Sequence, residues 1–112
     1  MNTSIPSTGT HKRFGQLDLY ADGDPDFRQV LINLMINNLA ELRRSITMEL
    51  AVFRKACHKM KTTLAMLGSR ELSDIVEELN HRIEGQDRID TFDKLCGDSI
   101  KSLWEEKNNN AC

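Results

Sequence analysis

The chain has 112 residues, enough for one domain with one modest hydrophobic core but too few for a substrate domain beside a cofactor domain. Its 15 Lys and Arg residues against 17 Asp and Glu residues give a formal charge of −2, which argues against a nucleic-acid partner. Three cysteines without a preceding signal-peptide-like segment argue against a disulfide framework and favour a cytoplasmic location. No segment has the length and hydrophobicity of a membrane span.

A polar lead precedes the first predicted element. Residues 1–13 are rich in Ser and Thr, so we expect them to be disordered, and residues 107–112, with three consecutive Asn residues, are expected to form a flexible tail. Between them, in residues 14–106, apolar residues recur at spacings of three and four. This periodicity predicts a single domain made of helices throughout.

The pair Asp24 and Pro25 predicts the start of a long helix. An Asp side chain accepts hydrogen bonds from the free N–H groups of a first helical turn, and Pro suits the first helical position. We expect this helix to end near Ser45, and a short helical turn is expected ahead of it at residues 17–20. The residues predicted to face the core are Phe27, Val30, Leu31, Leu34, Met35, Leu42 and Ile46.

A second helix is predicted between Thr47, as its N-terminal cap, and Gly68, as its C-terminal stop. Its apolar residues follow one another at intervals of 3, 4, 3, 4 and 3. A stripe of this kind faces the core of a bundle. It consists of Leu50, Phe53, Cys57, Met60, Leu64 and Leu67.

Two further helices are predicted after Gly68. Ser69 is the expected cap of the third helix and Gly85 its stop, and its inward residues are Leu72, Ile75, Val76, Leu79 and Ile83. The fourth begins near Asp87, has Trp104 at its edge, and buries Ile89, Phe92, Cys96, Ile100 and Leu103. Four amphipathic helices with short connections predict an all-α fold, an antiparallel up-and-down four-helix bundle with a short N-terminal extension.

His58 is the residue on which a functional prediction depends. It follows Cys57, so helical geometry turns its side chain roughly 130° from the centre of the apolar stripe and toward water. Arg54, Lys61, Thr62 and Ala65 are expected on the same side of the helix. A neutral imidazole is a nucleophile near pH 7, and neighbouring cations stabilise the oxygens of a phosphoryl group during transfer.

The segment from Ala56 to Gly68 resembles the signature of histidine phosphotransfer (HPt) domains. In that family a phospho-accepting His is followed by Lys at +3, Gly at +4 and a helix-closing Gly at +10. His58, Lys61 and Gly68 match this pattern, whereas Thr62 occupies the +4 position. The similarity continues into the entry of the first long helix at residues 23–27 and into residues 72–79.

The resemblance implies a phosphorelay protein of two-component signal transduction. His58 would accept a phosphoryl group from an aspartyl phosphate of one receiver domain and pass it to another, while Lys61 stabilises its charge. Receiver domains of response regulators or hybrid sensor kinases would be the partners, contacting Arg54, Thr62, Ala65 and an outward-facing Met66. The expected module is a monomer without a cofactor and without catalytic activity of its own.

The sequence also allows other interpretations. The branched Thr62 motivates a docking module that binds a receiver or sensor kinase but transfers nothing, and an unrelated structural bundle is a third possibility. A di-iron site would need two Glu-x-x-His pairs, and only Glu78 with His81 fits that spacing. Cys57 and Cys96 fall on apolar stripes and are expected in the core, so neither a zinc site nor another metal site is predicted.

Overall fold

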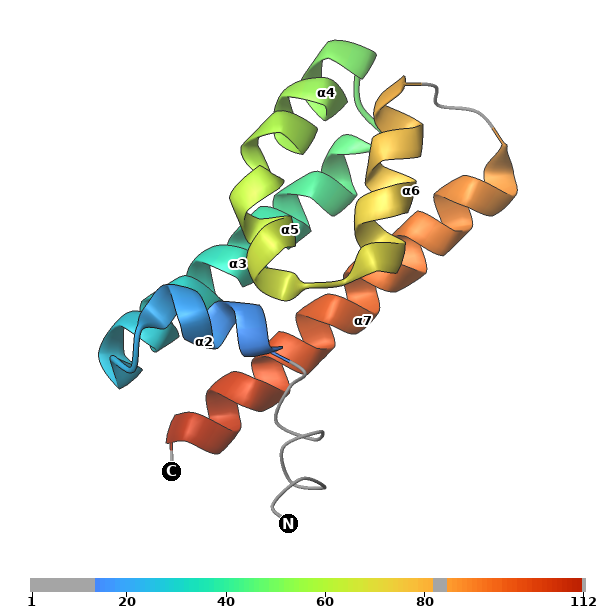
Figure 1. Ribbon diagram of the computed structural model, residues 1–112. Coiled ribbons are helices and arrows are strands. Elements are labelled where there is room, and N and C mark those ends of the chain that lie inside the picture. Colours follow the sequence, from blue (N-terminus) through green and yellow to red (C-terminus); the bar gives the residue numbers. More distant parts are fainter. Residues whose placement is uncertain (1–13, 82–84, 112) are drawn as a thin grey trace, which may run out of the picture.

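The computed structural model describes residues 14–81 and 85–111, and these residues are helical apart from short connections (Figure 1). The all-α class predicted from periodicity is confirmed. The predicted disordered lead at residues 1–13 lies outside the described part of the chain. The helices are α2 (Gly15–Ala21), α3 (Pro25–Ser45), α4 (Leu50–Lys59), α5 (Lys61–Leu67), α6 (Arg70–His81) and α7 (Gln86–Ala111).

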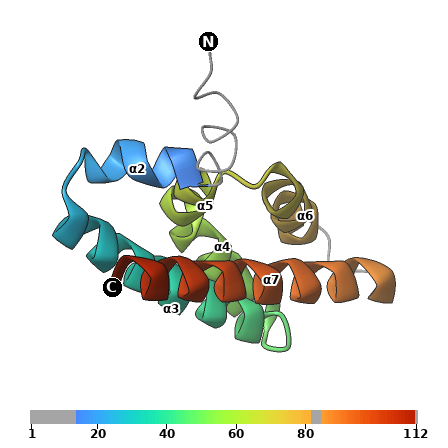
Figure 2. The ribbon, with the colours of Figure 1, turned by 90° about the horizontal axis from the view of Figure 1, so that it is seen from below.

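The two longest helices, α3 and α7, lie side by side and run in opposite directions (Figures 1 and 2). Figure 2 shows α2, α5 and α6 on one side of this pair, and α2 packs against both α3 and α5. From α3 through α4 and α5 to α6 and then α7, successive segments reverse direction (Figure 1). Each of the helices in the described ranges is too short or too polar to cross a bilayer.

Helix α3 begins where the Asp24 and Pro25 pair predicts. The Oδ1 atom of Asp24 accepts hydrogen bonds from the backbone N–H groups of Asp26, at 3.0 Å, and Phe27, at 3.1 Å. These bonds satisfy two of the donors that a first helical turn leaves free. Pro25 is the first helical residue, and α2 contains the helical turn expected at residues 17–20.

The buried face of α3 differs from the predicted one. Leu31, Met35 and Leu42 are buried as expected, but Phe27, Val30 and Leu34 are 44%, 59% and 46% exposed. The core instead includes residues that the predicted stripe omitted, namely Ile32, Ile36 and Leu39. The physical reason is that α3 contacts α2, α4, α5 and α7, and these neighbours cover an arc of the helix rotated away from Val30 and Leu34.

The predicted second helix is two helices that meet at Met60. The backbone N–H of Met60 lies 3.1 Å from the carbonyl oxygens of both Ala56 and Cys57, so the helical ladder tightens locally at this residue. Phe53, Cys57 and Met60 are buried as predicted.

The start of α4 also differs from the prediction. Glu49, not Thr47, occupies the N-cap position, and the Thr47 hydroxyl donates to the carbonyl oxygen of Arg44 at 3.0 Å. Leu50, predicted in the core, is 43% exposed, and Met48 and Val52 beside it are exposed as well. Met48 and Val52 share a groove with residues of α3 and are only partly covered by it, so about half of their surface remains open to water.

Capping residues end α5 and start α6 as the sequence predicts. Gly68 adopts a positive φ of 70°, which favours glycine, and Ser69 Oγ accepts a hydrogen bond from the backbone N–H of Leu72 at 3.3 Å. The predicted inward residues Leu72, Ile75, Val76 and Leu79 are buried, while Ile83 lies outside the described residues.

Helix α7 starts at Gln86 and continues to Ala111, past the predicted end of the bundle at residue 106. Phe92, Cys96 and Leu103 are buried and Ile89 and Ile100 are partly buried, close to the predicted pattern. Phe92 meets Phe53 of α4 edge to face, with ring centroids 5.9 Å apart. This pair joins the helix that carries His58 to the long helix α7.

Candidate functional site

His58 lies in the last turn of α4, and its side chain is exposed. Cys57, one residue earlier, is buried in the core at 6% exposure, so the helix turns the His58 ring outward as the sequence analysis expects. Within residues 14–81 and 85–111 the ring forms no hydrogen bond or ion pair. Its nitrogens are therefore available to a reactant from solvent.

A groove with a volume of about 560 Å³ runs between α4 and α5 on one side and α6 on the other. His58, Arg54, Lys61 and Ala65 all line it. Four of the six residues predicted from the sequence are thus brought to one site, although the helix that carries them is interrupted at Met60. The wall contributed by α6 consists of Ser73, Val76, Glu77 and Asn80.

Two predicted site residues do not line this groove. Thr62 is exposed but lies outside it, and Met66, predicted to face outward as a partner contact, is 1% exposed in the core. The prediction for Met66 is wrong because α5 packs against both α2 and α3, so two of its sides are covered. Thr63, which is not part of the predicted apolar stripe, is also buried. Its hydroxyl accepts a hydrogen bond from Asn38 Nδ2 at 3.0 Å.

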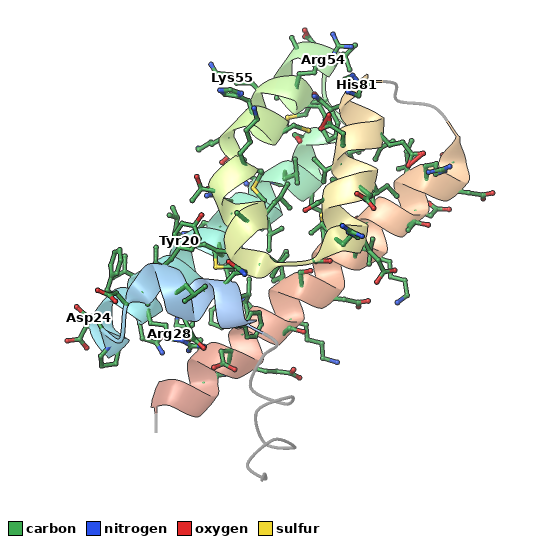
Figure 3. The ribbon with its side chains drawn as sticks, viewed as in Figure 1. Tyr20, Asp24, Arg28, Arg54, Lys55 and His81 are labelled. Carbon is green, nitrogen blue, oxygen red and sulfur yellow. The ribbon has the colours of Figure 1, made fainter. Side chains whose placement is uncertain are left out.

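The two cations of the groove differ in their surroundings. Arg54 Nε donates to the backbone carbonyl oxygen of Asn80 at 3.1 Å, which fixes the guanidinium between α4 and α6. Figure 3 shows Arg54 near His81, at the same end of the two helices. Lys61 has no ion-pair partner in the part of the chain that the structure describes. Its ammonium group is therefore free to approach an anion beside His58.

Glu77 lines the groove but is not among the site residues predicted from the sequence. Its carboxylate lies 3.1 Å from Nε2 of His81, one turn further along α6. The resemblance at residues 72–79 includes Glu77, but helical periodicity alone cannot tell which face of α6 meets α4. The site therefore contains a carboxylate as well as two cations.

The neighbouring thiol, Cys57, does not compete with His58 as a nucleophile. Burial, together with the negative charge of Glu77, raises the pKa of Cys57 to about 11. Burial likewise raises the pKa of Cys96 to about 12. Both thiols stay protonated near pH 7, and a protonated thiol is a poor nucleophile.

Metal binding finds no geometric support among the described residues, where no three His, Cys, Asp or Glu side chains form a cluster that could hold an ion. The spaced pair Glu78 and His81 does not act together. His81 contacts Glu77, whereas Glu78 forms an ion pair with Arg88 of α7. His81 is exposed and is the last residue of α6.

Comparison with known proteins assigns no family to this chain. No protein-family model matches the chain. Neither the curated proteins nor the solved structures include one that is significantly similar to it.

Proposed function

We propose that the protein is a histidine phosphotransfer module that carries a phosphoryl group on His58. The observation that carries this proposal is an exposed, unbonded imidazole that shares a groove with Lys61 and Arg54. The HPt-like spacing of His58, Lys61 and Gly68 adds to it. The proposed role is that of an intermediate carrier between two receiver domains, without catalytic activity of its own.

The helices are proposed to form the antiparallel four-helix bundle of such a module. Its four segments would be α3, α4 with α5, α6, and α7, and α2 would be the short N-terminal extension. The alternating direction of these segments supports the assignment (Figure 1). In such a bundle the active side chain projects from a helix flank that is held rigidly by the core below.

The proposed transfer is a displacement at phosphorus. A nitrogen lone pair of neutral His58 attacks the phosphorus of an aspartyl phosphate on the partner. The new N–P bond forms as the P–O bond breaks, and the aspartate leaves as a carboxylate. The return reaction places the same group on the carboxylate of a second receiver domain.

The two cations would act on the charge of the transferring group. Because phosphoryl transfer spreads negative charge over three oxygens, an ammonium or guanidinium group beside them lowers the barrier. Lys61 has no competing ion pair among the described residues, so it is the proposed main stabiliser. Arg54, held by Asn80, is proposed to assist from a fixed position.

A transfer assay tests the proposal. Incubation with a receiver domain phosphorylated on its aspartate should label the protein with a phosphoryl group that is acid-labile and alkali-stable, as expected of phosphohistidine. His58→Gln should abolish the label, and His81→Gln, which changes another exposed histidine outside the groove, should retain it. Label that persists in His58→Gln would refute the assignment.

A second candidate function is a docking module that binds a receiver or sensor kinase without accepting phosphate. Two observations favour it: Thr62 stands where the HPt signature has Gly, and the Glu77 carboxylate faces the groove. Binding measured by calorimetry with several phosphorylated receivers, together with no transfer to His58, would support this alternative. Restoration of transfer by Thr62→Gly would identify the branched side chain as the cause.

A further inference from the structure

A second groove lies on the flank of α4 that faces away from α6. It has a volume of about 420 Å³ and lies between the C-terminal part of α3 and α4. Three apolar residues line it and form an apolar stripe: Met48, in the turn before α4, and Val52 and Ala56, one helical turn apart on α4. Met48 and Val52 are 53% and 43% exposed. The groove therefore presents apolar surface that the described residues do not cover.

Positive charge surrounds this stripe. Arg44, Lys55 and Lys59 line the same groove, together with a single carboxylate, that of Glu41. Glu41 lies 3.2 Å from Lys59 Nζ, so these two charges offset each other. In the described ranges neither Arg44 nor Lys55 forms an ion pair. Two uncompensated cations thus flank an apolar floor.

We propose that this groove docks an acidic amphipathic helix of a protein partner. Apolar side chains of that helix would rest on Met48, Val52 and Ala56, and its carboxylates would pair with Arg44 and Lys55. Helix-in-groove recognition uses this combination of an apolar stripe for affinity and charge complementarity for specificity. A concave site is reached by a protruding helix and poorly by the flat surface of an anionic membrane.

The docking groove is separate from the groove of His58. Val52 and Arg54, which line the two grooves, are two residues apart, and helical geometry places them about 160° apart around the axis of α4. Figure 3 shows Lys55 on the flank of α4 opposite to Arg54. The two grooves share no lining residue, so the inference does not depend on phosphotransfer.

The test uses a fluorescent synthetic helical peptide with Leu at four-residue intervals on one face and Glu on the flanking positions. Fluorescence anisotropy should show saturable binding to the full chain, and NMR should place the shift changes at Met48, Val52 and Ala56. Arg44→Glu combined with Lys55→Glu should weaken binding tenfold or more, because two attractive contacts become repulsive. The matched control is Arg70→Glu combined with Lys101→Glu, which changes the net charge equally outside the groove and should leave binding within about twofold.

Several results would overturn the proposal. Equal weakening by both double variants would mean that the peptide responds only to net charge. Equal binding of a peptide with the same composition but a scrambled apolar stripe would show that the floor of the groove is not used. Shift changes confined to residues around His58, or binding to anionic lipid vesicles without binding to the peptide, would assign the surface to a different occupant.

Discussion

His58 owes its exposure to its neighbour. Because Cys57 is fixed in the core, the rotation of about 100° per residue carries the next side chain out of it. Lys61 then stands three residues further on, at the start of α5, and lines the same groove. At the scale of single residues, the proposed chemistry depends on this imidazole and on this ammonium group, and the carboxylate of Glu77 in the same groove is expected to oppose it.

Lys61→Ala should slow transfer to His58 about tenfold, because it removes a cation from the oxygens of the transferring group while leaving the nucleophile in place. We expect a smaller loss of rate than removal of a buried hydrogen-bond donor would cause, because solvent screens an exposed charge. The rate is measured by quenching the reaction with a phosphorylated receiver at short times. Lys61→Arg should recover most of the rate, and an unchanged rate in Lys61→Ala would exclude the proposed role of the ammonium group.

Glu77→Gln should raise the equilibrium constant for phosphorylation of His58 by about two- to fivefold, because a carboxylate in the same groove repels the phosphoryl group and an exposed charge interaction contributes up to about 1 kcal/mol. The fraction is measured after equilibration with a fixed excess of phosphorylated receiver. Glu78→Gln, which changes a carboxylate outside the groove, is the matched control. Equal fractions in the wild type and Glu77→Gln would show that Glu77 does not act on the phosphoryl group.

At the scale of elements, α5 is positioned by a polar contact in the core. Thr63 is 1% exposed, and its hydroxyl accepts the hydrogen bond of Asn38 Nδ2 from α3. The bond is partly buried, and a donor that loses its acceptor in such a place keeps part of the cost of its desolvation. This contact therefore helps to set where α5, and with it Lys61, lies relative to α3.

Thr63→Val should lower the free energy of unfolding by about 0.5–1.5 kcal/mol, because it keeps the shape of the side chain but leaves the half-buried Asn38 Nδ2 without its acceptor. Urea denaturation followed by circular dichroism measures the change. Thr63→Ser retains the hydroxyl and should lose less. If Thr63→Val is as stable as the wild type, water or another group satisfies Asn38 and the contact does not position α5.

At the scale of the whole molecule, ion pairs tie the long helices together. The guanidinium of Arg43 on α3 donates two hydrogen bonds to the carboxylate of Asp93 on α7, at 2.7 and 3.0 Å. Arg28 of α3 similarly joins Asp18 of α2, at 2.6 Å, and Glu106 of α7, at 2.9 Å. Burial of apolar side chains stabilises the core, and these ion pairs help to fix how α2, α3 and α7 are oriented relative to one another.

The Arg43 and Asp93 pair makes a small part of the stability depend on pH. The hydrogen bond from Arg43 lowers the pKa of Asp93 in the folded chain. The stabilisation is therefore fully present above the unfolded pKa of about 3.9 and is lost as the pH falls through the lower folded value. Asp93→Asn should cost about 0.5–1 kcal/mol at pH 7, since both side chains are substantially exposed.

Urea denaturation at pH 7 and at the lowest pH where the chain still folds measures this dependence. The difference between the wild type and Asp93→Asn should shrink at the lower pH. Lys94→Gln, which alters an exposed pair within α7, is the control for a general change in charge. A difference that stays constant with pH would mean that the Asp93 effect is not electrostatic.

Local sequence signals determined where α3 begins, where α5 ends and α6 begins, and how His58 is oriented relative to Cys57, but not the start of α4 or its interruption at Met60. Capping by Asp24 and Ser69 and the positive φ of Gly68 involve residues only a few positions apart, so they can be predicted from the sequence. The spacing of four residues was likewise sufficient to predict that they lie on one side of the helix, because residues three or four positions apart share a face. These residues are Arg54, His58, Lys61 and Ala65.

Only the tertiary structure decided which faces are covered and what lies opposite the site. The sequence shows that Val30, Leu34 and Met66 are apolar, but burial depends on which helices pack against each side, so the first two are exposed and the third is not. Glu77 lines the groove of His58 because α6 packs against α4 with this face. Helical periodicity is a local property of the chain, whereas the contact of α6 with α4 depends on how all the helices share one core.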